Sequence, residues 1–154
     1  MKIAMYKGPA KSLFQRFFHW LTCMVTGSVY SHCELVIDVN IVQGYALCMS
    51  SSMRDGGVRL KQINLSSGHW DVFDLPTFSP ADRQRALQWF IDHENEGYDW
   101  LGLLWFLIPV SFEKRRRWFC SEAIAASLNL PDPHKLHPQR LLDILSKEAA
   151  RVAT

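Results

Sequence analysis

The sequence predicts an α+β domain in which an antiparallel sheet or half-barrel packs against helices. Two observations lead to this fold class. Strand patterns follow one another between residues 29 and 75, whereas helix patterns dominate from residue 79 to residue 145, and such segregation is typical of α+β folds rather than of doubly wound parallel sheets. The chain has 154 residues, 48% hydrophobic and 21% charged, as expected for a single globular domain over residues 1–154.

The first half of the chain is expected to supply most of the sheet. Its segments are rich in β-branched and aromatic residues or alternate between apolar and polar positions, and glycine and proline separate them. One helix interrupts them, because apolar residues recur at three- and four-residue steps after Ser12, a suitable N-cap. The expected elements are strands at 2–6, 29–39, 44–52, 58–65 and 69–75, a helix at 12–26 and a turn at 54–57.

The second half is expected to be helical. Ser79 and Pro80 form an N-cap and a first helical position ahead of an apolar stripe. The apolar run from Trp100 to Val110 is shorter than the ~20 residues that span a bilayer, so it predicts a buried helix that ends near Pro109. The expected helices start at Ser79, run from Asp99 to about Leu107, start near Cys120 and follow Pro138.

Composition argues against several classes of function. The net charge of +2 is too small to predict nucleic-acid binding. The first residues lack the apolar core of a signal peptide, and no run is long enough to span a bilayer, so we expect a cytoplasmic protein without stable membrane insertion. The same lack of a secretory signal predicts reduced thiols. None of the four cysteines forms a C-x-x-C pair and the histidines include no H-E-x-x-H pattern, so we expect no metal and no cofactor.

Cys120 is the candidate nucleophile. It stands in "RRRWFCSEAIAA", where a loop with three arginines turns into a helix. A thiol in the first helical turn experiences the positive end of the helix dipole and free backbone N–H groups, which favour the thiolate. Free cysteines are more often small buried apolar residues, and Cys23, Cys33 and Cys48 are interpreted in that way because they lie within apolar helix or strand patterns.

His32 is the candidate base. A nucleophilic cysteine needs a base within hydrogen-bond reach, usually a histidine that a third polar group orients. His32 lies in a strand whose other residues indicate core, where a polar ring needs a reason; a ring that is simply hydrogen-bonded to a backbone carbonyl is the structural alternative. His69, at the start of another strand, is the weaker candidate.

Two segments, "YSHCELVI" (Tyr30 to Ile37) and "WFCSEAIAASL" (Trp118 to Leu128), together resemble the permuted branch of the NlpC-type papain-like cysteine hydrolases. In that branch the histidine strand precedes the cysteine helix, an order shared by relatives of lecithin retinol acyltransferase. "SSSMRDGGVRL", "GYDWLGLL" and "HPQRLLDIL" resemble further parts of the family in the same order, so the resemblance covers Met1 to about Leu145.

The resemblance implies a circularly permuted papain-like fold with Cys120 at a helix N-terminus facing His32 on the sheet. It also implies a mechanism. His32 takes the thiol proton, the thiolate attacks an acyl carbon, and water or another acceptor resolves the thioester. The backbone N–H of Cys120 would stabilise the oxyanion, because free donors at a helix start point that way.

The third catalytic residue has two candidates, since the family uses a polar side chain there, often on the strand after the histidine strand. Ser50 would lie opposite His32 if residues 40–42 formed a three-residue loop, and a two-residue loop would place Met49 there. Glu34 is the other candidate, two residues from His32 on the same strand face. Related sequences often carry a carboxylate or an amide, from which a serine departs.

Three further residues are candidates for binding substrate. Tyr98 would shape the pocket, although an aromatic residue before a helix also suits packing. Glu122 would bind substrate or Arg117, although an acid in the first helical turn also suits the helix dipole. Arg117 would suit an anionic substrate if the arginine run lined the cleft, although such runs are usually solvated.

The leading functional hypothesis is a cysteine peptidase or amidase that hydrolyses an amide bond, for example in a cell-wall peptide or a protein tail. An acyltransferase or lipid-directed thioesterase is the second hypothesis, because relatives of lecithin retinol acyltransferase share the same residue order. A non-catalytic binding module of the same fold is the third. The resemblance suits a protein of a bacterium or a bacteriophage.

Overall fold

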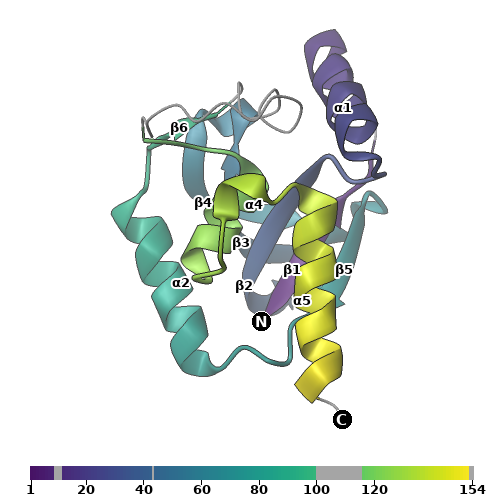
Figure 1. Ribbon diagram of the computed structural model, residues 1–154. Coiled ribbons are helices and arrows are strands. Elements are labelled where there is room, and N and C mark those ends of the chain that lie inside the picture. The colour runs from purple at the N-terminus through teal and green to yellow at the C-terminus, as the bar shows by residue number, and fades with distance from the viewer. Residues whose placement is uncertain (9–11, 43, 100–115, 153–154) are drawn as a thin grey trace.

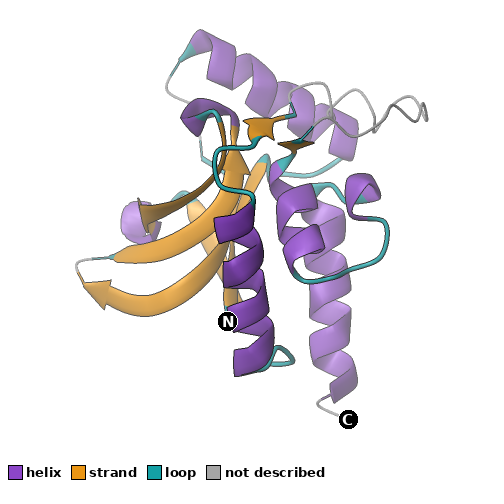
Figure 2. Ribbon diagram, turned by 90° about the vertical axis from the view of Figure 1, so that its left-hand side faces the viewer, coloured by secondary structure: helices purple, strands orange, loops and turns teal. Residues whose placement is uncertain are grey.

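The computed structural model describes residues 1–8, 12–42, 44–99 and 116–152. Within these ranges a curled seven-stranded sheet packs against helices, which confirms the predicted α+β class (Figures 1 and 2). The strands are β1 Lys2–Tyr6, β2 His32–Val42, β3 Tyr45–Ser52, β4 Gly57–Asn64, β5 Trp70–Asp74, β6 Gly97–Tyr98 and β7 Arg117–Trp118. The helices are α1 Leu13–Thr26, α2 Pro80–Asp92, α4 Cys120–Ser127 and α5 Pro138–Val152.

The predicted elements are mostly confirmed, with differences at their ends. β2 begins at His32, three residues later than expected, and continues to Val42. The helix expected from Asp99 to about Leu107, and with it the run from Trp100 to Val110, falls on residues 100–115, which lie outside the described residues. None of the helices within the described ranges has the length and apolar character that crossing a bilayer demands.

The strand order is β5-β1-β2-β3-β4-β6-β7. Neighbouring strands are antiparallel except for β6 and β7, which are parallel. The sheet is therefore mixed, and the expectation of a purely antiparallel sheet was wrong at this edge. A tight hairpin cannot join parallel strands, and residues 99–116 separate β6 from β7 in the chain.

The predicted caps hold the first turns of two helices. The Ser12 hydroxyl accepts a hydrogen bond from the backbone N–H of Gln15 at the start of α1. Ser79 and Asp82 form a reciprocal capping box at the start of α2, with Pro80 in the first helical turn. These side chains satisfy backbone N–H groups that the helices leave unpaired, so the sequence marks both starts correctly.

The main core lies between the sheet and the helices α2, α4 and α5. Leu35 and Met49 from the sheet are fully buried there, together with Ile124 of α4. Helix α4 is central, since it contacts β2, β3, α2 and α5, and Figure 2 shows it on the helical side of the curled sheet. Because α4 is short and enclosed, its first residue, Cys120, is held in the interior and against β2.

Gly57 is expected to tolerate no side chain. Its φ is 156°, and a Cβ atom there would collide with the backbone carbonyl of Glu96, beside the place where β4 pairs with β6. We expect Gly57→Ala to lower the free energy of unfolding by roughly 3 kcal/mol, because the rigid backbone must move. Gly56→Ala is the matched control: its φ is 90° but its Cβ would meet open space, so only about 1 kcal/mol of backbone strain is expected. Urea unfolding of both variants measures the difference, and equal losses would contradict the clash.

Candidate active site

Strand β2 presents its residues alternately to two faces of the sheet, and its first residues meet the start of α4. Cys33 and Leu35 lie in the core beneath the helices with Cys120, while Glu34 belongs to the other face. The His32 side chain, at the strand start, is 22% exposed, whereas Cys120 is fully buried. The site is therefore closer to solvent on the side of the imidazole than on that of the thiol.

Glu34 contacts the His32 ring. The Nε2 atom of His32 lies 2.8 Å from Oε1 of Glu34, and the carboxylate is only 1% exposed. The imidazole is also hydrogen-bonded to the Cys120 thiol. Since Nε2 faces Glu34, Nδ1 is the nitrogen left for sulfur. The three side chains thus form the order thiol, imidazole, carboxylate that a nucleophile, its base and an orienting group require.

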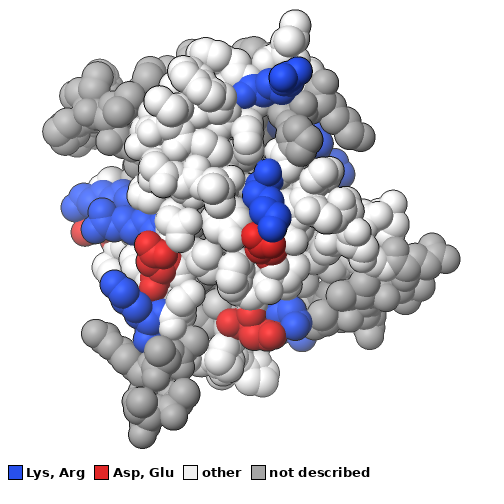
Figure 3. Space-filling model, turned by 90° about the vertical axis from the view of Figure 1, so that its right-hand side faces the viewer, with Lys and Arg blue, Asp and Glu red and all other residues white. Residues whose placement is uncertain are grey.

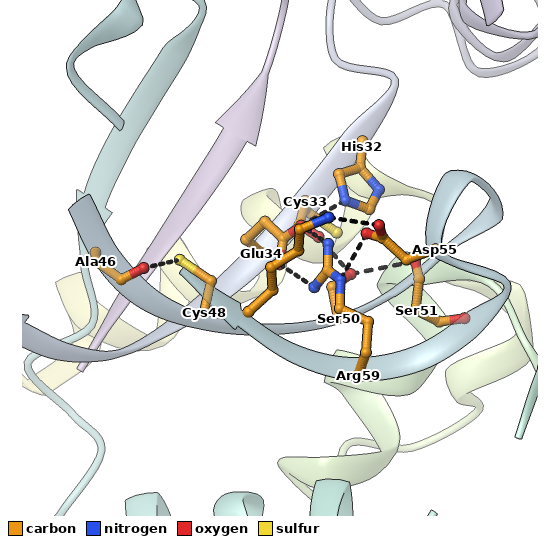
Figure 4. A network of polar contacts seen from close by, with 10 residues as sticks. His32, Cys33, Glu34, Ala46, Cys48, Ser50, Ser51, Asp55 and Arg59 are labelled. Atoms are coloured by element: carbon orange, nitrogen blue, oxygen red, sulfur yellow. Dashed lines mark hydrogen bonds and ion pairs between the residues drawn. The ribbon is translucent and has the colours of Figure 1, made fainter. Parts of the chain in front are cut away.

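Arg59 on β4 holds the other side of Glu34. Its Nη1 and Nη2 donate to Oε2 and Oε1 of the carboxylate at 2.8 and 2.5 Å, a bidentate pair. Arg59 pairs with Ser50 of β3 in the sheet, so its guanidinium reaches across β3 to β2, as Figure 4 shows. The pKa of Glu34, which burial alone would raise, is lowered by its hydrogen bonds to Arg59 and His32 and by their charges.

A second carboxylate extends this chain of charges. Arg59 Nε donates to Oδ2 of Asp55 at 2.9 Å, and Lys61 Nζ donates to Oδ1 of the same residue at 2.6 Å. Burial opposes ionisation of Asp55, but these two cations outweigh it and bring its pKa to about 2. The guanidinium therefore lies between two ionised carboxylates, and its bond to Asp55 fixes its orientation toward Glu34 (Figure 4).

The environment of Cys120 favours the thiolate. Burial raises the pKa of the thiol, but a hydrogen bond from the Cys33 side chain and the charge and hydrogen bond of His32 outweigh burial and lower the pKa to about 5. The His32 pKa responds in the opposite sense: burial lowers it, the negative charges of Cys120 and Glu34 raise it, and it reaches about 9. Between these two values the pair is a thiolate and an imidazolium.

Cys33 is a site residue that the sequence analysis missed. It was interpreted as a packing residue, and it is indeed fully buried, but its thiol also donates a hydrogen bond to Cys120. Burial, the Cys120 thiolate and Glu34 all raise the Cys33 pKa well above its usual value, so it remains a proton donor. The signal in the sequence was its position between His32 and Glu34, because side chains alternate along a strand and Cys33 therefore points to the opposite face, toward the helices.

Ser50 does not contact His32 in the way that the predicted register required. Leu35 pairs with Met49, so the ladder is displaced by two residues from the register that would set Ser50 opposite His32. Strand β2 continues to Val42, and register irregularities between Val36 and Val42 cause the shift. The buried Ser50 hydroxyl donates instead to the Cys33 carbonyl at 2.7 Å. Of the two candidates for the third residue, Glu34 is the one beside the imidazole.

Ser51 ties the sheet to the segment that carries the thiol. Its hydroxyl donates to the backbone carbonyl of Trp118 at 2.7 Å, two residues before Cys120. The Trp118 indole donates to Glu96 at 2.6 Å, so the segment is held on both sides. These contacts fix where α4 starts relative to β2 and β3.

The three candidate substrate-binding residues have different surroundings. Tyr98 is close enough to Cys120 that, after burial, the thiolate charge is the main cause that raises its pKa, and its ring packs against Phe119. The Glu122 carboxylate accepts a hydrogen bond from the Phe119 backbone N–H at 3.3 Å, so it contacts the start of α4, where an acid also suits the helix dipole. Arg117 is exposed on β7.

His69, the weaker candidate for the base, lies before β5 with its ring against Tyr6. His32 has Trp70 of that strand as its aromatic neighbour, with ring centroids 6.3 Å apart. The imidazole beside Cys120 is therefore that of His32.

Comparison with protein-family models finds no match, and comparison with curated protein sequences finds no significant match.

Proposed function

We propose that this chain is a cysteine hydrolase of permuted papain-like fold that cleaves an amide or related acyl bond through a thioester. The observation that carries the proposal is the contact order Cys120, His32, Glu34, in which a buried carboxylate 2.8 Å from the imidazole orients the group beside the thiol. The chain order, with the histidine strand first and the cysteine helix last, fits the permuted family that the sequence resembles.

The proposed reaction begins with the charged pair already formed. The Cys120 thiolate attacks the acyl carbon, a C–S bond forms, and the carbonyl oxygen becomes an oxyanion beside the backbone N–H of Cys120 at the start of α4. The His32 imidazolium then gives its proton to the leaving amine as the C–N bond breaks, which leaves a thioester and a neutral imidazole. His32 acts first as an acid because its proton is already in place.

Water completes the cycle. The neutral imidazole takes one proton from water while the remaining hydroxide attacks the thioester carbon. The C–S bond breaks, the carboxylic acid leaves, and the thiolate and imidazolium are restored. Glu34 favours both protonations of His32 because it is ionised and aimed at Nε2 by Arg59. An amine or alcohol in place of water would give acyl transfer by the same steps.

The proposal predicts an acyl-enzyme. Incubation with p-nitrophenyl acetate should release p-nitrophenolate and leave an acetyl group on Cys120 that neutral hydroxylamine removes, since thioesters are more labile to it than amides. The acetylated residue is identified by peptide mass spectrometry. Cys23 serves as an internal control, because it is partly exposed whereas burial raises its pKa, so it should acquire less acetyl than the buried Cys120.

Two results would count against the proposal. Acetylation that is equal on Cys23 and Cys120 would show that the thiol is not activated. Unchanged release of p-nitrophenolate by Cys120→Ser would show that another group reacts. If Cys120 is acetylated but not deacetylated by water, an added amine or alcohol distinguishes the acyltransferase from the hydrolase. Only an acyltransferase transfers the acetyl group from Cys120 to the added acceptor.

A further inference from the structure

The solvent face of α1 is apolar. Leu13, Phe17, Trp20 and Met24 succeed one another at steps of four, three and four residues, and their exposed fractions are 83, 53, 54 and 64%. At this spacing they form one stripe along three turns of the helix, which we call the α1 stripe. Val29, just after the helix, is also 64% exposed.

Two polar residues of α1, Thr22 and His19, face the protein. Thr22 is buried, and its hydroxyl donates to the Phe18 carbonyl within the helix. The Nδ1 atom of His19 lies 2.6 Å from the hydroxyl oxygen of Ser31. Phe18 and Leu21 of the same helix pack against the main core, so α1 is apolar on its solvent side as well as on its core side, whereas an ordinary surface helix turns polar residues toward water. The α1 stripe therefore carries a cost in water that contact with an apolar partner would remove.

The size of the α1 stripe argues against a second copy of the chain as that partner. Large side chains bury roughly 150–250 Å² each, so four that are half to four-fifths exposed present on the order of 500 Å². Stable protein interfaces bury about 800 Å² on each partner. One narrow row of side chains falls short of that area, whereas a helix in the plane of a bilayer interface needs only one apolar face to enter the boundary.

The charges around α1 point the same way. No Asp or Glu precedes Glu34 in the chain. Lys2 and Lys7 are neutralised by Asp74 and Asp71, but Arg16, exposed beside the stripe, has no ion pair to another described residue. Figure 3 shows few charged side chains in its upper part, where α1 lies. An anionic surface would attract the unpaired Arg16 side chain.

We infer that the α1 stripe docks the protein on an anionic lipid surface, lying in the plane of the interface. Phe17 and Trp20 would enter the boundary between head groups and acyl chains, with Arg16 at the level of the phosphates. Since His19 joins α1 to Ser31, the neighbour of His32, docking would also hold the candidate site near that surface. The inference does not depend on the proposed chemistry of Cys120.

Vesicle flotation tests the inference with the whole chain. The wild type should float with vesicles of phosphatidylcholine and phosphatidylglycerol in equal parts, and less with phosphatidylcholine alone. Phe17→Gln combined with Trp20→Gln should weaken binding at least tenfold, because two apolar side chains no longer enter the interface. Ile91→Gln is the matched control, since Ile91 is 49% exposed on α2, and it should float like the wild type.

Arg16→Gln separates the charge from the apolar contact. It should reduce binding to the anionic vesicles and leave binding to phosphatidylcholine unchanged. Absence of flotation, or equal flotation of the wild type and the double variant, would overturn the inference. So would sedimentation velocity in which the wild type dimerises and the double variant does not, because the partner of the stripe would then be a second copy. Gln is a good helix former, and circular dichroism verifies that α1 persists in each variant.

Discussion

His32→Gln is expected to move the midpoint of Cys120 alkylation from about pH 5 to about 8.5 or above, the ordinary range of a thiol. Glutamine keeps a side chain of similar reach that can form hydrogen bonds, but it removes the positive charge. What remains around the thiol is burial, which raises the pKa, and the Cys33 hydrogen bond, which lowers it. The charge of His32 is therefore the contribution that this substitution isolates.

Iodoacetamide alkylation followed by peptide mass spectrometry across a pH series measures this midpoint. The midpoint is a better readout than the rate at one pH, because a thiolate of higher pKa is also intrinsically more nucleophilic and partly offsets its lower population. Cys23 in the same samples should keep its profile in both proteins. An unchanged Cys120 midpoint in His32→Gln would mean that the imidazole does not create the thiolate.

The same pair of pKa values predicts the pH range in which the site works. Below about 5 Cys120 gains a proton and loses its nucleophilicity, and above about 9 His32 loses the proton that the leaving group needs. Turnover of an acyl substrate should therefore rise through the first value and fall through the second. A rate that kept rising beyond the second value would contradict the role of His32 as an acid.

The elements of the fold were predictable where local patterns decide them. The caps at Ser12 and Ser79 are local, because a side chain bonds to a backbone group three residues away, and both helices begin where predicted. The parallel pairing of β6 and β7 was not predictable in this way. Each strand has only two residues, too few to show a period, and the pairing joins Gly97 to Arg117, which are 20 residues apart in the chain.

The candidate site was predictable in part. Cys120 and His32 stand out as a thiol at a helix start and a polar ring in an apolar strand, whereas Ser50 was placed by a register count that the irregular ladder from Val36 to Val42 upset. Arg59 was missed because it alternates with Val58 and Leu60, as a solvent-facing residue would. The available signal was Glu34 itself, since a carboxylate in a buried strand needs a cation.

Arg59→Met is expected to destabilise the fold by about 3 kcal/mol or more near pH 7. The Glu34 carboxylate, 1% exposed, would lose both hydrogen bonds to the guanidinium, and an uncompensated buried charge is costly. Asp55 would keep Lys61 as a partner, so the loss concerns Glu34. Urea unfolding of the variant and the wild type measures it, and a loss below about 1 kcal/mol would mean that the pair is dispensable.

The pH dependence of this loss has a definite sign. In the wild type the pKa of Glu34 is lowered, so its ionised form contributes stability above the pKa of the unfolded chain, about 4.3. That contribution disappears as the pH falls through the lowered value. In Arg59→Met the effect of burial on Glu34 is opposed only by His32, so the pKa of Glu34 moves upward. The difference in stability between the two proteins should therefore grow as the pH rises from about 4 to 7.

The double variant Glu34→Gln, Arg59→Met separates stability from positioning. Without the carboxylate no charge is left unpaired, so much of the stability lost in Arg59→Met should return. The imidazolium, however, loses the Glu34 carboxylate and keeps only the Cys120 thiolate as an ionised partner, so the His32 pKa should fall and the upper limit of the pH range of turnover should move below about 9. Arg59→Lys should have a stability between those of the wild type and Arg59→Met, because an ammonium keeps the charge but cannot form the bidentate pair. If the double variant recovered both stability and the wild-type pH range, Glu34 and Arg59 would be structural partners only, and the orienting group of His32 would have to be sought elsewhere.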